Sequence, residues 1–216
     1  MQTVLSIANG LLVLLVLLNF AVLGSSRMTA LIRTVAIQGL ILGALPQLRS
    51  IEISAHLIAV GASTVVIKAI FIPWLLSRAM RDVRIRREVD PLMGYIPSLL
   101  LGALGTGMAV IFANTLPIAP AQGGPLVLAT SISTLLTGFI VLTTRRKAIN
   151  QVVGYLILEN GIFIFGLLLL DAVPLLVEVG VLLDLFVAVF VMAIILNHIQ
   201  ATFSSQDTTR LSTLKE

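Results

Sequence analysis

The chain has 216 residues, of which 58% are hydrophobic and 11% are charged, and its formal net charge is +4. Soluble domains carry about 25% charged residues, so this composition excludes a soluble globular domain and predicts an integral membrane protein. There is no cysteine, and His56 and His198 are too few for a histidine metal site. We therefore expect no metal, no cofactor and no nucleic acid partner.

Hydrophobic runs predict an all-α, polytopic membrane protein, because about 20 apolar residues in a helix cross a bilayer. The N-terminal run lacks the basic segment of a cleaved signal peptide, so we expect a retained first helix. Seven spans are expected, at residues 3–24, 28–46, 52–78, 92–115, 125–144, 149–170 and 175–201.

The placement of lysine and arginine predicts the orientation. With seven spans, the basic segments after the first, third and fifth helices and the basic C-terminal tail share one side of the membrane. A six-span arrangement would divide them between the two sides. The sequence therefore predicts a protein of the cell (inner) membrane with its N-terminus outside and its C-terminus in the cytoplasm.

A weak internal match aligns VGASTVVIKAIFI, from Val60, with VGVLLDLFVAVFV, from Val179. In the same register Arg27 falls on Arg146, each just before a helix. The match predicts a parallel repeat of two three-helix units, an arrangement that some transporters use. The expected layout is a first unit with a basic loop, a linker helix, and a second unit with a short tail, at residues 1–90, 91–124 and 125–216. Chance similarity among apolar helices is the alternative.

Three ionisable side chains are expected at similar depth inside the membrane: Lys68, Glu159 and Asp184. A charge near the bilayer centre costs about 2.5–3.5 kcal/mol on insertion scales, so its retention points to a function. A buried carboxylate can load and release a proton, and Tyr155 lies one helical turn before Glu159. We interpret these four residues as a candidate proton path. A static polar clamp that fixes helix packing is the alternative.

Other polar side chains in the spans are expected to face the bundle or a water-filled cavity. Thr134 belongs to a polar line along the fifth span, and His56 is expected near the outer surface, as a proton entry or as an interfacial residue. No nucleophile–base pair or nucleotide-binding loop is visible, so we expect no catalytic residue and no catalysis by the chain alone. The residues that could support the path are His56, Gln38, Thr64 and Thr134.

The stretches GYLILENGIFIFGLLLL, VEVGVLLDLFVAVFVMAIIL and DTTRLSTLKE resemble the hydrogenase-4 component E family, membrane subunits of group 4 hydrogenase and formate hydrogenlyase-type complexes. The last three helices of that family are similar to the K subunit of respiratory complex I and to the C subunit of multi-subunit sodium/proton antiporters. The resemblance implies that Glu159 and Asp184 stand at or near two membrane glutamates of the K subunit. The first repeat has Leu40 and Val65 at these positions, and so lacks the acids.

The resemblance further implies a membrane-arm subunit of a hydrogenase-like or complex I-like oxidoreductase complex that contributes to a proton or sodium-ion path. The implied partners are antiporter-like and other membrane-arm subunits, the lipid bilayer and, indirectly, a soluble hydrogenase-like redox arm. Two alternatives remain: a scaffold subunit that holds the antiporter-like subunits, and an independent secondary transporter.

Overall fold

Long apolar runs form helices, and a computed structural model of the protein describes them over residues 2–49, 55–82, 92–118 and 124–168. Within these ranges the chain forms helices and no strand, which confirms the all-α prediction. The helices are α1 (Gln2–Gly24), α2 (Met28–Arg49), α3 (Ala55–Thr64), η1 (Val65–Phe71), α4 (Ile72–Asp82), α5 (Tyr95–Thr115), α6 (Gly124–Thr144) and α7 (Ala148–Gly166).

Six segments of the described residues are long and apolar enough to cross a membrane, and the chain is a multi-pass membrane protein. They correspond to the first six expected spans. Helix α2 continues through Pro46 to Arg49, three residues beyond the expected end. The seventh expected span, 175–201, lies outside the described residues, and the three-helix repeat stays a prediction.

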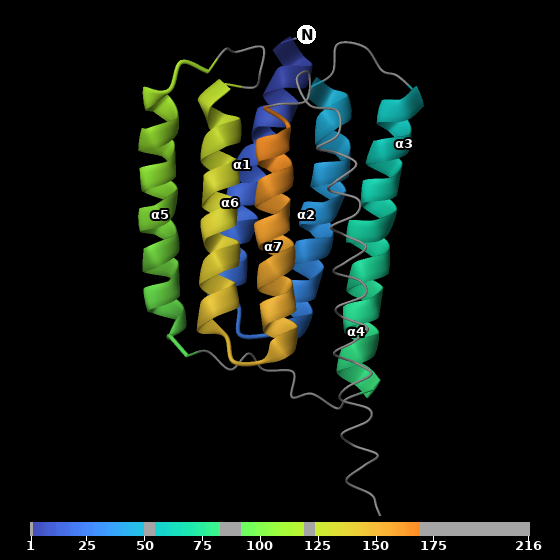
Figure 1. Cartoon of the computed structure of the whole chain (residues 1–216), viewed down its shortest axis with the longest axis vertical. Helices are drawn as coiled ribbons and strands as arrows, with labels where there is room; N and C mark the ends of the chain where they lie inside the picture. Colours follow the sequence, from blue (N-terminus) through green and yellow to red (C-terminus); the bar gives the residue numbers. More distant parts are fainter. Residues whose placement is uncertain (1, 50–54, 83–91, 119–123, 169–216) are drawn as a thin grey trace, which may run out of the picture.

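Four helices form the centre of the bundle: α1 contacts α2 and α6, and α7 contacts α2 and α6. Helix α5 packs on α1 and α6, and α3, η1 and α4 pack on α2. Figure 1 shows α5 at one edge of the bundle and α3 and α4 at the other. Side chains between the four central helices are therefore removed from lipid.

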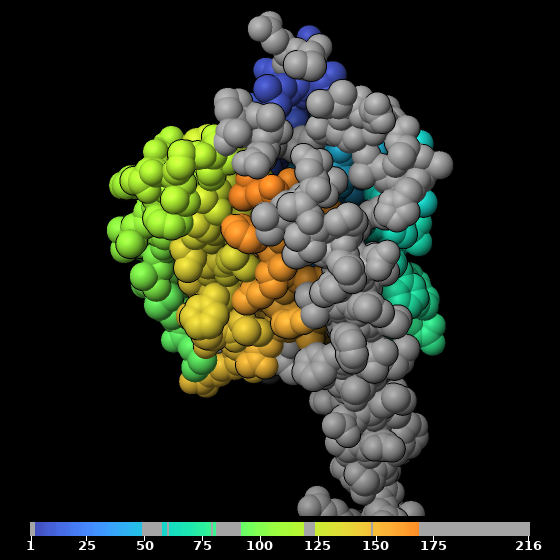
Figure 2. All heavy atoms as spheres, turned by 45° about the horizontal axis from the view of Figure 1, so that its top comes forward, coloured from blue at the N-terminus to red at the C-terminus, as the bar shows by residue number. Residues whose placement is uncertain are grey.

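The outer face of α5 is apolar, which suits contact with lipid tails. Figure 2 shows α5 at the edge of the molecule, beside α6 and away from α3 and α4. The large exposed side chains of α5 include Ile96, Leu100, Leu104, Met108 and Ile111.

Helices α6 and α7 approach each other at backbone distance through three glycines. A Cβ added at Gly154 would lie 2.6 Å from the backbone nitrogen of Leu142, and one at Gly161 would lie 2.7 Å from that of Leu135. A Cβ at Gly138 would overlap the backbone of Leu158. Small residues at helix interfaces allow this approach in membranes, where close packing stabilises association.

The third span is not the uniform α-helix that its sequence suggests, because the segment η1 between α3 and α4 is π-helical. The amide of Ile72 donates to the carbonyl of Ile67, five residues earlier. Pro73 follows directly, has no amide hydrogen and would clash with the carbonyl four residues before it in a regular α-helix. A wider turn removes this conflict, and it places Lys68 on the π segment.

The basic connection between α6 and α7 has a structural role as well as the expected topological one. Arg145 is buried, its Nη2 donates to the carbonyl of Leu23 at 3.1 Å, and its guanidinium lies 5.1 Å from the centre of the Tyr95 ring. Burial lowers the pKa of the guanidinium, an effect that Tyr95 opposes. Arg145 therefore joins the end of α1 to the start of α5.

Substitution of a contact glycine should destabilise the bundle. Gly154→Ala places a methyl group against the backbone of Leu142, which cannot rotate away, and should cost about 1–3 kcal/mol of unfolding free energy. Thermal unfolding in detergent measures the loss. Gly107→Ala is the control, because nothing lies within 4 Å of its added Cβ. Equal melting temperatures for the two variants would contradict the backbone contact.

The expected orientation can be tested with single cysteines, since the chain contains none of its own. Ser26 and Thr115 are both exposed and lie at opposite ends of the bundle, since the α1–α2 and α5–α6 connections are at opposite ends in Figure 1. In intact cells, an impermeant thiol reagent should label Thr115→Cys and reach Ser26→Cys only after permeabilisation. The reverse pattern would invert the orientation.

Candidate functional site

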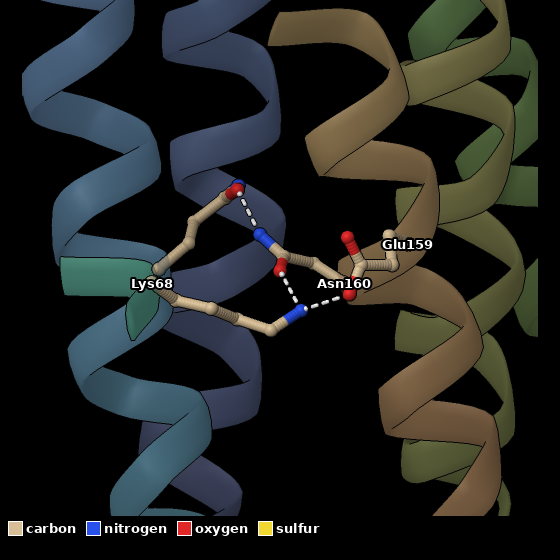
Figure 3. Close-up of polar contacts among 4 residues, drawn as sticks. Lys68, Glu159 and Asn160 are labelled. Atoms are coloured by element: carbon tan, nitrogen blue, oxygen red, sulfur yellow. Dashed lines mark hydrogen bonds and ion pairs between the residues drawn. The ribbon is translucent and has the colours of Figure 1, made fainter. Parts of the chain in front are cut away.

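A buried ion pair joins the third span to α7. Lys68 comes from η1 and Glu159 from α7, and the Lys68 Nζ lies 2.7 Å from the Glu159 Oε1. The two side chains are 5% and 2% exposed. Figure 3 shows them pointing toward each other from facing helices. The structure thus joins two of the three ionisable residues that the sequence placed at similar depth.

The Lys68 ammonium has a second acceptor, the Oδ1 of Asn160, at 3.3 Å. The amide nitrogen of Asn160 in turn donates to the Oε1 of Gln38 on α2, at 3.2 Å. Both amides are 2% exposed or less. Figure 3 shows Asn160 between Lys68 and the next polar partner, so that Asn160 connects the ion pair to α2.

The hydrogen bonds continue from α2 to α1 and α6. The Nε2 of Gln38 donates to the Oδ1 of Asn19 at 2.9 Å, and the Nδ2 of Asn19 donates to the hydroxyl of Thr134 at 2.9 Å. The Thr134 hydroxyl donates to the carbonyl of Thr130 at 2.7 Å. We call Asn160, Gln38 and Asn19 the amide chain. Together with the ion pair and Thr134 it connects η1, α7, α2, α1 and α6.

Close packing of α2 on η1 positions Lys68. A Cβ added at Gly39 would lie 2.7 Å from the Lys68 Cβ and 2.9 Å from its carbonyl carbon. The Lys68 Nζ also lies 5.8 Å from the centre of the Phe163 ring, within range of a cation–π interaction. The lysine is therefore fixed at its backbone by α2 and at its charged end by α7.

Of the other predicted residues, some join this polar network, some lie apart from it, and the side chains of two are not described by the structure. Thr134 and Gln38 belong to the polar network, and Thr64 is buried one turn before Lys68. Tyr155 is half-buried and packs against an apolar cluster one turn from Glu159. Asp184 and the side chain of His56 lie outside what the structure describes. The roles of all these residues stay predictions.

Sequence reasoning missed Asn19 and Asn160, which carry two of the amide links. Asn19 stands in an apolar run, LLNFAVL, and Asn160 follows Glu159 in LENGIF. An amide within a membrane span is itself a signal of an interhelical hydrogen bond. The polar line of α6 makes further contacts. The Ser133 hydroxyl lies 2.7 Å from that of Thr106 on α5, and Ser131 donates to the carbonyl of Gly161 at 2.9 Å.

Comparison with known proteins finds relatives along most of the chain. It is 35% identical over 206 residues to "Uncharacterized protein Rv0085" of Mycobacterium tuberculosis (strain ATCC 25618 / H37Rv), across 94% of this chain and 93% of that protein. It is 28% identical over 155 residues to hydrogenase-4 component E of Escherichia coli K12, across 72% of each, and equally to that of Shigella flexneri. No protein-family model and no solved structure matches.

A double-mutant cycle should show that the ion pair is coupled. Lys68→Met leaves a buried, uncompensated carboxylate and should cost about 3–5 kcal/mol of unfolding free energy. The double variant Lys68→Met, Glu159→Met removes both charges and should recover most of that loss. Unfolding of wild type, both single variants and the double variant in detergent gives the coupling energy. Losses that simply add would show that the two charges do not stabilise each other.

Proposed function

The chain belongs to the family of the mycobacterial protein Rv0085 and is a distant homologue of hydrogenase-4 component E, and from this we propose that it is a membrane subunit of a hydrogenase-type complex. The same homology supports a multisubunit membrane assembly. Within it, the proposed neighbours are antiporter-like and other membrane-arm subunits, with a soluble redox arm as an indirect partner. The proposed location is the cell inner membrane.

We further propose that this subunit contributes to a proton path through Glu159. The observation that carries the proposal is the buried ion pair between Lys68 on η1 and Glu159 on α7. Each charge costs free energy inside a membrane, and ionisable residues there commonly serve ion pathways and proton relays. Glu159 would take up and release the proton, and Lys68 would control when it does so.

The ion pair gives a physical basis for this control. An ammonium within contact distance favours the ionised form of a carboxylate. If Lys68 moves away from Glu159, or its charge is neutralised, the buried carboxylate loses that stabilisation and takes up a proton. The return of Lys68 releases the proton again. Asp184 is the proposed next carrier, and Tyr155 would act beside Glu159.

The backbone that carries Lys68 supports such a movement. Lys68 lies on the π segment η1, and single π turns within α-helices are frequent at functional sites. A change of register within η1 would turn its side chains relative to α7, and Pro73 would oppose a fully α-helical register. The proposed movement of Lys68 thus requires a local rearrangement of η1 against its close contact with Gly39 of α2.

A scaffold subunit is the second candidate. It is favoured by the amide chain, which joins several helices by buried hydrogen bonds and would suit a rigid support for larger subunits. In this alternative Lys68 and Glu159 are a permanent pair. The two functions differ in one respect, because only the relay requires Glu159 to change its protonation state.

Replacement of the glutamate by its amide separates the candidates. Glu159→Gln keeps the shape of the side chain and a hydrogen-bond acceptor for Lys68, but it cannot carry a proton. In proteoliposomes holding the assembled complex, we expect this variant to keep its redox turnover and lose ion pumping.

Arg33→Gln is the matched control, since it also removes one charge, from an exposed side chain of α2. It should pump like the wild type. Unchanged pumping by Glu159→Gln, with assembly verified in the same samples, would reject the relay and leave the scaffold function.

A further inference from the structure

All links of the amide chain donate in the same direction, away from Lys68. Asn160 accepts from Lys68 and donates to Gln38, Gln38 donates to Asn19, and Asn19 donates to Thr134. The Thr134 hydroxyl in turn donates a hydrogen bond to the Thr130 carbonyl. The series begins at an ammonium group and ends at a backbone acceptor.

The charge on Lys68 determines this direction. An ammonium has three donors and no acceptor, so only the oxygen of the Asn160 amide can face it. The nitrogen of Asn160 must then face Gln38, which has to present its oxygen to Asn160 and its nitrogen to Asn19. The same argument fixes Asn19. A buried amide turned the wrong way would place donor against donor, at a cost of about 1–3 kcal/mol.

The amide chain positions the charged Lys68 ammonium and does not conduct protons. Asparagine and glutamine are absent from the side chains that titrate in water, so no link of the chain can accept a proton and pass it on near neutral pH. All three amides are 2% exposed or less, so they lie away from lipid and solvent. Their remaining effect is on the position of the Lys68 ammonium relative to Glu159.

We propose that Asn160, Gln38 and Asn19 are positioning residues, which hold the Lys68 ammonium at Glu159 through a series of hydrogen bonds whose direction the charge on Lys68 sets. This inference rests on the proposed function of Glu159 and adds residues of α1 and α2 to it. Asn19 of α1 and Gln38 of α2 thereby affect whether the lysine stays beside the carboxylate.

Two substitutions of Gln38 test the proposal in proteoliposomes that hold the assembled complex. Gln38→Met keeps a similar volume but neither accepts from Asn160 nor donates to Asn19. We expect several-fold fewer ions pumped per turnover at every pH, with redox turnover intact. Asn114→Leu is the control, since it removes an exposed amide of α5 that bonds its own helix at Val110. It should pump normally.

Gln38→Glu provides a conditional rescue. A protonated glutamate accepts from Asn160 through its carbonyl oxygen and donates to Asn19 through its hydroxyl, which preserves the direction of the chain. An ionised glutamate cannot donate to Asn19 and also attracts Lys68, the nearest cation in the described network. Pumping by this variant should match the wild type at the acidic end of the profile and fall as pH rises. With assembly verified at each pH, a purely structural role for Gln38 would not produce this added pH dependence.

Three measurements test the positioning role and separate it from the proton path. Wild-type pumping by Gln38→Met, or by Asn19→Leu if the former does not assemble, would overturn the positioning role. A pH profile of pumping by Gln38→Glu that is identical to that of the wild type would also overturn it. Glu159→Gln, measured alongside, keeps the proposals apart: if it fails to pump while Gln38→Met pumps normally, only the positioning role is rejected, whereas normal pumping by Glu159→Gln rejects the proton path itself.

Discussion

The ion pair of Lys68 and Glu159 places two charges at the centre of a bundle where neither lipid tails nor apolar side chains can form hydrogen bonds. At this depth a polar atom can find a hydrogen-bond partner only within the protein. The second acceptor for the ammonium is Asn160, which lies next to Glu159 on the same turn of α7. Once Asn160 points its oxygen at Lys68, its nitrogen needs a partner, and this requirement extends through α2 to α1.

The helices approach closely enough for polar side chains on three of them to meet. Hydrogen bonds of 2.9 Å join Gln38 to Asn19 and Asn19 to Thr134, across three different helices. Glycine makes a comparable approach possible elsewhere, where Gly39 brings α2 against the backbone of Lys68 and Gly154 brings α7 against α6. At Lys68 the two features coincide, because Gly39 allows the close packing of α2 against the backbone of the buried lysine.

The sequence predicts most of this fold, because a run of about 20 apolar residues has few other possibilities. It also places Lys68 and Glu159 at one depth, from their distances to the helix ends. It could not show that they touch, since depth carries no information about rotation around a helix axis. The π segment escaped prediction because Pro73 conflicts with a regular helix without determining how the conflict is resolved.

The sequence also gives no indication of which polar side chains contact a neighbouring helix, and this explains why two amides and one arginine were not predicted as contacts. Attention to ionisable groups left out Asn19 and Asn160, whose amides cost less to bury than a charge but still require partners. The sequence indicates only a topological role for Arg145, although the side chain is 1% exposed and donates to the carbonyl of Leu23. Whether an arginine at a helix end lies in headgroups or inside the protein depends on the neighbouring helices, here on the end of α1 and on Tyr95 of α5.

A clamp and a relay would use the same contacts, and the energetics separate them better than the geometry does. Replacement of a buried ion pair by apolar residues of similar volume is often neutral or stabilising, so a lysine and a glutamate are a poor choice for helix packing alone. The amide chain could hold the helices together without any charge, since each amide both donates and accepts. The charges add a state that can change. Removal of the positive charge, or its displacement with η1, removes the partner of the Glu159 carboxylate. It also removes the group that sets the direction of hydrogen-bond donation along the amide chain. This favours a site that retains its charges because Lys68 can move and Glu159 can change its protonation state.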